Sequence, residues 1–137
     1  MILADTTAWV EYDRATGSTV DLRLTKLITE CRQLDVTEPV IMEVLVGART
    51  DAQEAALLRL LLRFELLPFQ PQTDFIGASR IYRQCRAAGI TPRGTVDCMI
   101  AAVAWRTGAS VLAHDMDLVR IALVVGIPFD KASPRVS

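Results

Sequence analysis

Short apolar runs alternate with longer segments of helical spacing along this chain. The runs at 1–4 and 110–113 are almost wholly apolar, as expected of strands that are buried on both faces. Each run is followed by residues that can cap a helix and then by a helical pattern. This alternation predicts crossover connections, and therefore an α/β fold in which a short, mainly parallel sheet lies between two layers of helices.

Polar and small residues mark where the helices are expected to begin and end. Thr6 or Thr7 can cap the first helix, Ser18 the second, and Thr37 the third, which has Pro39 in its first turn. The second and third helices are expected to end near 32 and 47. Four later helices are expected: 51–63, a helix from Thr73 or Asp74 to 88, 96–106 with Thr95 as its cap, and a helix from after Asp115 to 125. The other strands are expected at 34–36, 64–69 and 127–129.

Length and composition indicate a single domain with its own core. The chain has 137 residues, of which 51% are hydrophobic, so a core can form without covalent cross-links. Cys31, Cys85 and Cys98 are odd in number and lie in apolar or helical segments, which indicates neither a disulfide framework nor a zinc site. No basic leader and no apolar run of about 20 residues is present, so we expect a cytoplasmic protein without a membrane span.

Four carboxylates interrupt the apolar segments: Asp5, Glu43, Asp97 and Asp115. A lone buried charge is costly, and the nearest arginines and lysines lie outside these segments. Asp5 and Asp115 each follow a predicted strand, at the edge of the sheet where ligands of α/β proteins bind. If the four side chains converge, they require a cation, and hard ions such as Mg²⁺ or Mn²⁺ are held by carboxylate oxygens. Asp117 is a weaker fifth member of this predicted metal site.

Each aspartate of this group also has an ordinary structural interpretation. Asp5 and Asp115 can cap the helices that follow them, and Asp97 in a first turn is favoured by the helix dipole. Glu43 has no such role, because it is the only charge between Pro39 and Ala48. Considered together, the four positions favour a functional site.

The charge balance bears on the kind of substrate. The net charge of −1 argues weakly against a nucleic-acid ligand, but without the four carboxylates 12 acidic residues remain against 15 basic ones. Between 75 and 105 there are four arginines and one acid. Arg80, Arg83 and Arg86 form a ridge that leads to Arg93, just before Asp97. Arg93 and Arg86 are therefore candidates for binding substrate phosphates.

The acidic segments resemble the four acidic motifs of PIN domains, and among these the VapC-type toxins of bacterial toxin–antitoxin systems. The segments are MILADTTAW, PVIMEVLVGA, TVDCMIAAVAW and VLAHDMDL, which cover the chain from 1 to about 129 in the expected order. The resemblance implies a Mg²⁺- or Mn²⁺-dependent endoribonuclease that is neutralised by a small VapB-like antitoxin and forms a homodimer. It also implies that Asp5, Glu43, Asp97 and Asp115 are the metal-site acids, with Asp117 accessory and Thr6 beside the substrate.

Several alternatives stay open at this level. Asp115 and Asp117 both suit the last acidic position, and His114 beside them fits a rim residue better than a general acid. The leucine-rich stretch at 57–62 fits core burial or a groove for a partner helix. Two other functions are compatible with the acids: another magnesium-dependent α/β phosphate-ester hydrolase, faintly suggested by Asp115 and Asp117, and a non-catalytic PIN-like binding module.

Overall fold

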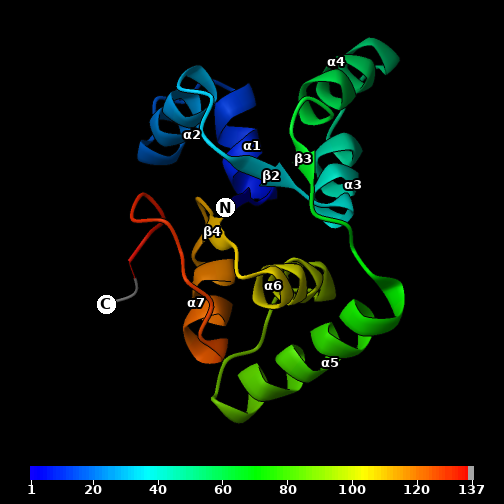
Figure 1. The fold of residues 1–137 in the computed structure, drawn as a ribbon, viewed down its shortest axis with the longest axis vertical. Helices are drawn as coiled ribbons and strands as arrows, with labels where there is room; N and C mark the ends of the chain where they lie inside the picture. Colours follow the sequence, from blue (N-terminus) through cyan, green and yellow to red (C-terminus); the bar gives the residue numbers. More distant parts are fainter. Residues whose placement is uncertain (136–137) are drawn as a thin grey trace.

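Four short parallel strands form the centre of the computed structural model, which describes residues 1–135 (Figure 1). They are β1 (Ile2–Ala4), β2 (Leu34–Val36), β3 (Glu65–Leu66) and β4 (Ser110–Leu112), in the spatial order β3-β2-β1-β4. Leu3 of β1 lies opposite Asp35 of β2 on one side and Val111 of β4 on the other. The predicted parallel sheet is confirmed.

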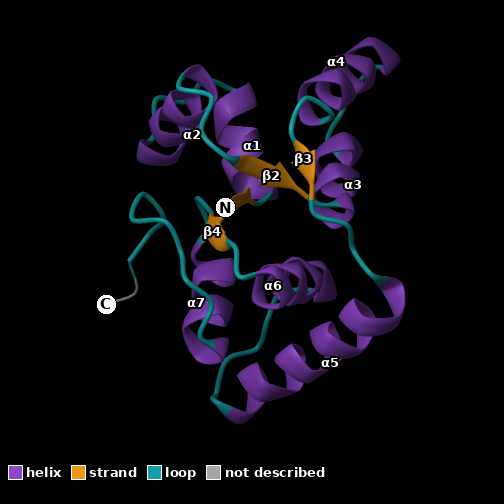
Figure 2. Ribbon diagram, viewed as in Figure 1, coloured by secondary structure: helices purple, strands orange, loops and turns teal. Residues whose placement is uncertain are grey.

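Helices cover both faces of this sheet (Figures 1 and 2). One layer contains α1 (Thr6–Asp13), α2 (Thr19–Thr29), α3 (Glu38–Val46) and α4 (Asp51–Leu61). The opposite layer contains α5 (Pro71–Ala87), α6 (Thr95–Thr107) and α7 (Met116–Val125). The predicted α/β fold with helices on either side of the sheet is therefore confirmed.

The strand order reverses between β1 and β4. From β1 the chain continues to β2 and β3 in one direction, and it then returns to the other side of β1 as β4. As a result, α1 and α7 leave neighbouring strands toward opposite faces of the sheet (Figure 1). A reversal of this kind opens a crevice at the carboxyl ends of the two strands, which is where open α/β sheets bind their ligands.

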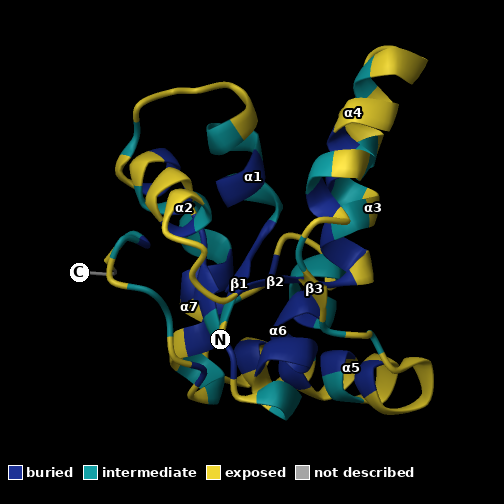
Figure 3. Ribbon diagram, turned by 45° about the horizontal axis from the view of Figure 1, so that its top comes forward, coloured by how far each residue is buried: buried dark blue, intermediate teal, exposed yellow. Residues whose placement is uncertain are grey.

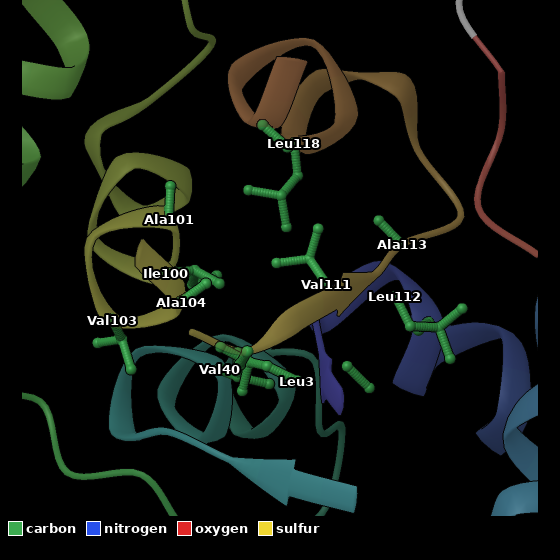
Figure 4. Close-up of a cluster of buried hydrophobic side chains, with 14 of the residues drawn as sticks. Leu3, Val40, Ile100, Ala101, Val103, Ala104, Val111, Leu112, Ala113 and Leu118 are labelled. Carbon is green, nitrogen blue, oxygen red and sulfur yellow. The ribbon is translucent and has the colours of Figure 1, made fainter. Parts of the chain in front are cut away.

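The core packs between the sheet and the two helical layers. Leu3, Val111 and Ile100 are completely buried, and Figure 4 shows them with neighbouring side chains of β4, α3, α6 and α7. Helix α6 is buried along most of its length, whereas α4 projects from the body of the molecule with an exposed outer face (Figure 3). Strands β1 and β4 therefore lie against a buried part of the fold.

Two helix caps differ from the prediction. Asp5, and not Thr6 or Thr7, is the N-cap of α1, because its carboxylate accepts the backbone N–H of Ala8. Gly94 is the N-cap of α6, so Thr95 is the first residue inside that helix. The predicted cap of α2 is confirmed, and the third helix begins after Thr37 without a side-chain cap bond.

The edge strands are shorter than the sequence suggests. The strand expected at 64–69 is reduced to Glu65–Leu66, because its only partner, β2, has three residues and Pro68 has no N–H to donate. The strand expected at 127–129 is a single bridge between Phe129 and Val111. Helix α5 begins earlier than expected, at Pro71, and the Asp74 carboxylate accepts the N–H of Gln70 before it.

Two expectations from composition can be compared with the structure. All three cysteines are free thiols: Cys31 is exposed, and Cys85 and Cys98 are buried. Within residues 1–135, no helix combines the length and the apolar character that a membrane span requires.

A buried carboxylate lies in the middle of β2, away from the predicted site. Asp35 is only 1% exposed, and neither of its side-chain oxygens has a hydrogen-bond partner within the described residues. Burial is the main cause that raises the pKa of this carboxyl group above its usual value. Ionised Asp35 therefore destabilises the fold.

We predict that Asp35→Asn increases the free energy of unfolding at pH 7 by roughly 1 kcal/mol or more, because an unpaired buried charge costs more than an unpaired buried amide. The raised pKa means that folding favours the protonated form, so the gain should shrink as the pH falls toward 4 and wild-type Asp35 becomes neutral. Urea denaturation at pH 4, 5.5 and 7 measures this difference. An equal gain at every pH would contradict the assigned cause.

Candidate active site at the carboxyl edge of the sheet

Two of the predicted acids lie where β1 and β4 end. Asp5 follows β1 and caps α1 by accepting the N–H of Ala8 at 2.9 Å. Asp115 follows β4 and caps α7 by accepting the N–H of Asp117 at 3.1 Å. Both aspartates therefore have the structural role that the sequence allowed, and both follow the strands between which the strand order reverses.

Thr7 ties these two strand ends together. Its hydroxyl donates to Asp5 Oδ1 at 2.7 Å and accepts the backbone N–H groups of His114 at 2.9 Å and of Asp115 at 3.3 Å. The sequence suggests Thr7 only as a local cap. Its actual role depends on β4 lying beside β1, which links positions more than a hundred residues apart.

The other two acids come from helices on opposite faces of the sheet. Glu43, in α3, accepts the Thr6 hydroxyl at 2.6 Å. Asp97 lies in the first turn of α6. Both side chains are half-buried, so each charge is partly withdrawn from water. Thr6, predicted to lie beside the substrate, thus contacts Glu43 directly and fixes its orientation.

Burial, together with repulsion from neighbouring acids, makes Asp5 and Asp97 weaker acids than an ordinary aspartate. Burial raises the pKa of Asp5 to about 7, with smaller contributions from Asp97 and Glu43, while its bonds from Thr7 and Ala8 act in the opposite direction. Burial, followed by repulsion from Glu43, Asp117 and Asp115, raises the pKa of Asp97 to about 6. The four predicted acids therefore share one electrostatic environment.

Arg93 is the cation that faces the acids most directly. Its guanidinium Nε lies 2.9 Å from Asp117 Oδ2, and its Nη1 lies 3.7 Å from Asp115 Oδ2. Its charge also lowers the pKa of Asp97, although less than the surrounding acids raise it. The side chain is 76% exposed, so these ion pairs are weak. Arg86, in the last turn of α5, is exposed and forms no ion pair with the acids within residues 1–135.

The donor set suits a hard divalent cation in its chemistry, because it consists of carboxylates that lack sufficient counter-charge. Across residues 1–135, however, no three His, Cys, Asp or Glu side chains stand in an arrangement that would hold one metal ion together. Arg93 engages Asp115 and Asp117, while Asp5 bonds with Thr7 and Glu43 with Thr6. The acids therefore lie near one another, and in this structure they form hydrogen bonds and ion pairs with protein side chains.

Comparisons with known proteins assign a family to this arrangement. The model of the PIN domain matches residues 2–124. Ribonuclease VapC11 of Mycobacterium tuberculosis and VapC ribonuclease Mb1587 of Mycobacterium bovis are each 41% identical to this chain over 128 residues, which cover 93% of this chain and 96% of theirs.

Solved structures show the same fold at low sequence identity. The crystal structure of VapBC2 from Rickettsia felis, bound to a DNA fragment from its promoter, contains a chain that superposes with a TM-score of 0.74 at 16% identity. The match covers 95% of this chain and 98% of that one. This likeness supports the fold independently of the sequence matches.

The raised pKa of Asp5 predicts how stability depends on pH in the metal-free protein. Because the folded state binds this proton more tightly than the unfolded state, the free energy of unfolding should fall as the pH rises from about 4 to about 7 and then level off. The contribution of Asp5 is at most on the order of 4 kcal/mol. Asp5→Asn keeps a capping residue and should remove much of this slope in denaturant titrations with chelator.

Asp13→Asn is the matched control, since Asp13 is exposed at the other end of α1. It should leave the slope unchanged. An Asp5→Asn protein whose stability has the same pH dependence as the wild type would show that Asp5 is not held in a proton-binding environment.

Proposed function

The chain belongs to the PIN-domain family and, within it, to the VapC ribonucleases, and on this basis we propose that it is a metal-dependent endoribonuclease toxin controlled by an antitoxin. The observation that carries the proposal is the meeting of acids from four separate segments at one edge of the sheet. In addition to burial, Asp97 and Glu43 raise the pKa of Asp5, and Glu43, Asp117 and Asp115 raise the pKa of Asp97. The reaction is hydrolysis of a phosphodiester bond of RNA.

We propose Mg²⁺, with Mn²⁺ as a substitute, as the cation held by this site. Asp5, Asp97 and Asp115 would hold it, with Glu43 and the accessory Asp117 beside them. A bound divalent ion supplies an activated water and stabilises the leaving oxygen in phosphodiester hydrolysis. It would also supply the counter-charge that the acids lack. Thr6 orients Glu43, and Thr7 holds the ends of β1 and β4 at a fixed separation.

Arg93 and Arg86 are the proposed contacts to RNA phosphates. Both side chains are exposed, and they lie on the α5–α6 side of the acids. Arg93 is already beside Asp115 and Asp117, so it needs only to turn outward to meet a phosphate placed at the acids. Arginine suits this role because its planar guanidinium can donate two hydrogen bonds to one phosphate.

A groove on the other side of the site fits the proposed antitoxin. A cavity of about 250 Å³ lies between α1, α3 and α4, and Trp9, Val44 and Leu57 supply its apolar wall. Leu57 and Leu61 are buried, whereas Leu62 is 64% exposed, so the leucine-rich stretch contributes to the core and to the surface. An extended or helical antitoxin segment would cover this surface.

The proposed homodimer has a separate candidate surface. Phe75 and Ile76 of α5 are each more than half exposed, although both are large and apolar. A cavity of about 460 Å³ beside them is lined by Phe75, Tyr82 and Met99. Association of two copies through this face would remove that apolar area from water.

The comparisons give less support to the two alternative functions than to the proposed ribonuclease. Another magnesium-dependent phosphate-ester hydrolase would not account for 41% identity to named ribonucleases over 93% of the chain. A non-catalytic PIN-like module would not need the full set of acids, and all four are present. Activity measurements separate both alternatives from the proposed ribonuclease.

We predict that the purified chain, free of any antitoxin, cleaves RNA with Mg²⁺ or Mn²⁺ and that Asp97→Asn reduces the rate at least about 100-fold. Loss of one metal-holding carboxylate weakens the binding and placement of the ion that would activate the water and stabilise the leaving oxygen. The folded structure should persist, because the substitution removes a charge that is repelled by its neighbours. Cleavage of labelled RNA and a thermal melt measure the two effects.

Asp51→Asn is the matched control, because Asp51 is also an acid in the first turn of a helix but is exposed at the start of α4. It should retain full activity. Cleavage in excess chelator, or an active Asp97→Asn protein, would reject the mechanism.

Removal of Arg93 should have opposite effects on metal and RNA. Because the Arg93 ion pairs with Asp115 and Asp117 compete with a metal ion, Arg93→Met is expected to tighten Mn²⁺ binding by about two- to fivefold in calorimetry without RNA. RNA binding should weaken. Arg86→Met, which breaks no ion pair with the acids, should leave Mn²⁺ affinity unchanged. Weaker Mn²⁺ binding in Arg93→Met would instead mean that Arg93 positions the carboxylates for the metal.

A further inference from the structure

A cavity of about 480 Å³ opens in the crevice between the N-terminal ends of α1 and α7. Thr6 and Asp115 line one part of it, and both belong to the acid group described above. Val10 and Met116 add apolar surface. The cavity is therefore continuous with the proposed site of phosphodiester hydrolysis and lies at the reversal of strand order, where α/β proteins bind ligands.

The rest of the lining contains a polar pair that hydrolysis does not use. Glu11 and His114 both line the cavity, and the Nε2 atom of His114 lies 3.5 Å from Glu11 Oε1. The same oxygen accepts the Thr16 hydroxyl at 2.9 Å. Glu11 Oε2 has no hydrogen-bond or ion-pair partner among the residues that the structure describes. The carboxylate is thus fixed through one oxygen, while the other can accept a hydrogen bond from a ligand.

We propose that this crevice holds the nucleotide next to the scissile phosphate and that Glu11, positioned by His114 and Thr16, selects guanine there. This inference rests on the proposed ribonuclease function. The volume of the cavity lies within the range of cavities that enclose small organic ligands, and the mixture of apolar surface and few polar groups in its lining is typical of such sites. Unpaired bases of RNA are recognised in this way, by apolar contact and by hydrogen bonds to their edges.

The preference for guanine follows from the chemistry of a carboxylate. An ionised carboxylate only accepts hydrogen bonds. Guanine presents two adjacent donors, its ring N1–H and its exocyclic amino group. Adenine and cytosine present an amino donor beside a ring acceptor that repels the carboxylate, and uracil presents one N–H between two carbonyl oxygens. The affinity of the crevice is therefore expected to be highest for guanine and lowest for uracil.

The first experiment uses His114, which is the only histidine of the chain, as a reporter. The side-chain NMR signals of His114 are followed while GMP, AMP, CMP or UMP is added to the full chain in chelator. We expect GMP to shift these signals with an affinity about tenfold higher than that of UMP, as a two-donor contact allows. Equal responses to all four nucleotides, or no response of His114, would overturn the proposal.

The second experiment measures selection during cleavage. RNA with randomised positions is cut by the wild type, by Glu11→Gln and by Glu30→Gln, and the products are sequenced. Glu30 is an exposed acid at the end of α2 and provides a matched loss of charge. Guanine should be enriched at one position next to the cut for the wild type and for Glu30→Gln, and this enrichment should be lost with Glu11→Gln. A preference that Glu11→Gln leaves unchanged would reject the assigned role.

Failure of the two proposals can be told apart. A wild type that cuts RNA without any base preference beside the cut contradicts the guanine subsite and leaves the ribonuclease function standing. A wild type that cuts no RNA contradicts the ribonuclease function, and the nucleotide titration, which needs neither metal nor catalysis, still tests the subsite.

Discussion

The burial of carboxylates beside one another determines the properties of this edge of the sheet. Asp5 and Asp97 are withdrawn from water and lie close enough to other acids that both bind protons near neutral pH. Arg93 supplies one exposed, partial counter-charge. An assembly of this kind is destabilised by its own ionisation until a cation enters, and this couples the charge state of the site to the stability of the fold.

The hydrogen bonds that hold the acids in place are the same bonds that build the fold locally. Asp5 and Asp115 cap the two helices that diverge from the reversal of strand order, and the Thr7 hydroxyl joins the two caps. The capping interpretation of these aspartates is therefore confirmed, and it is compatible with the proposed role of the same carboxylates in holding a metal ion. A cap fixes the side chain without neutralising its charge, which leaves the carboxylate available to a cation.

Local patterns were sufficient for most of the fold, and they failed where neighbours decide the outcome. The strand Leu34–Val36 and the cap at Ser18 agree with the prediction, because both follow from hydrophobic pattern and capping chemistry within a few residues. The strand expected at 64–69 was too long, since the length of an edge strand depends on its partner. The burial of Asp35 was not predicted from the sequence, because it results from the neighbouring strands, which exclude water from this side chain.

By itself the sequence was sufficient to predict the α/β class, to show the resemblance to PIN domains and to single out the four acids. Each of these depends only on residue types at fixed local spacing. Only the tertiary structure placed Thr7 against His114, Arg93 against Asp117, and Glu11 beside the crevice. These contacts join segments that are distant in the chain. They exist because β4 returns to lie beside β1, a long-range pairing that no local pattern encodes.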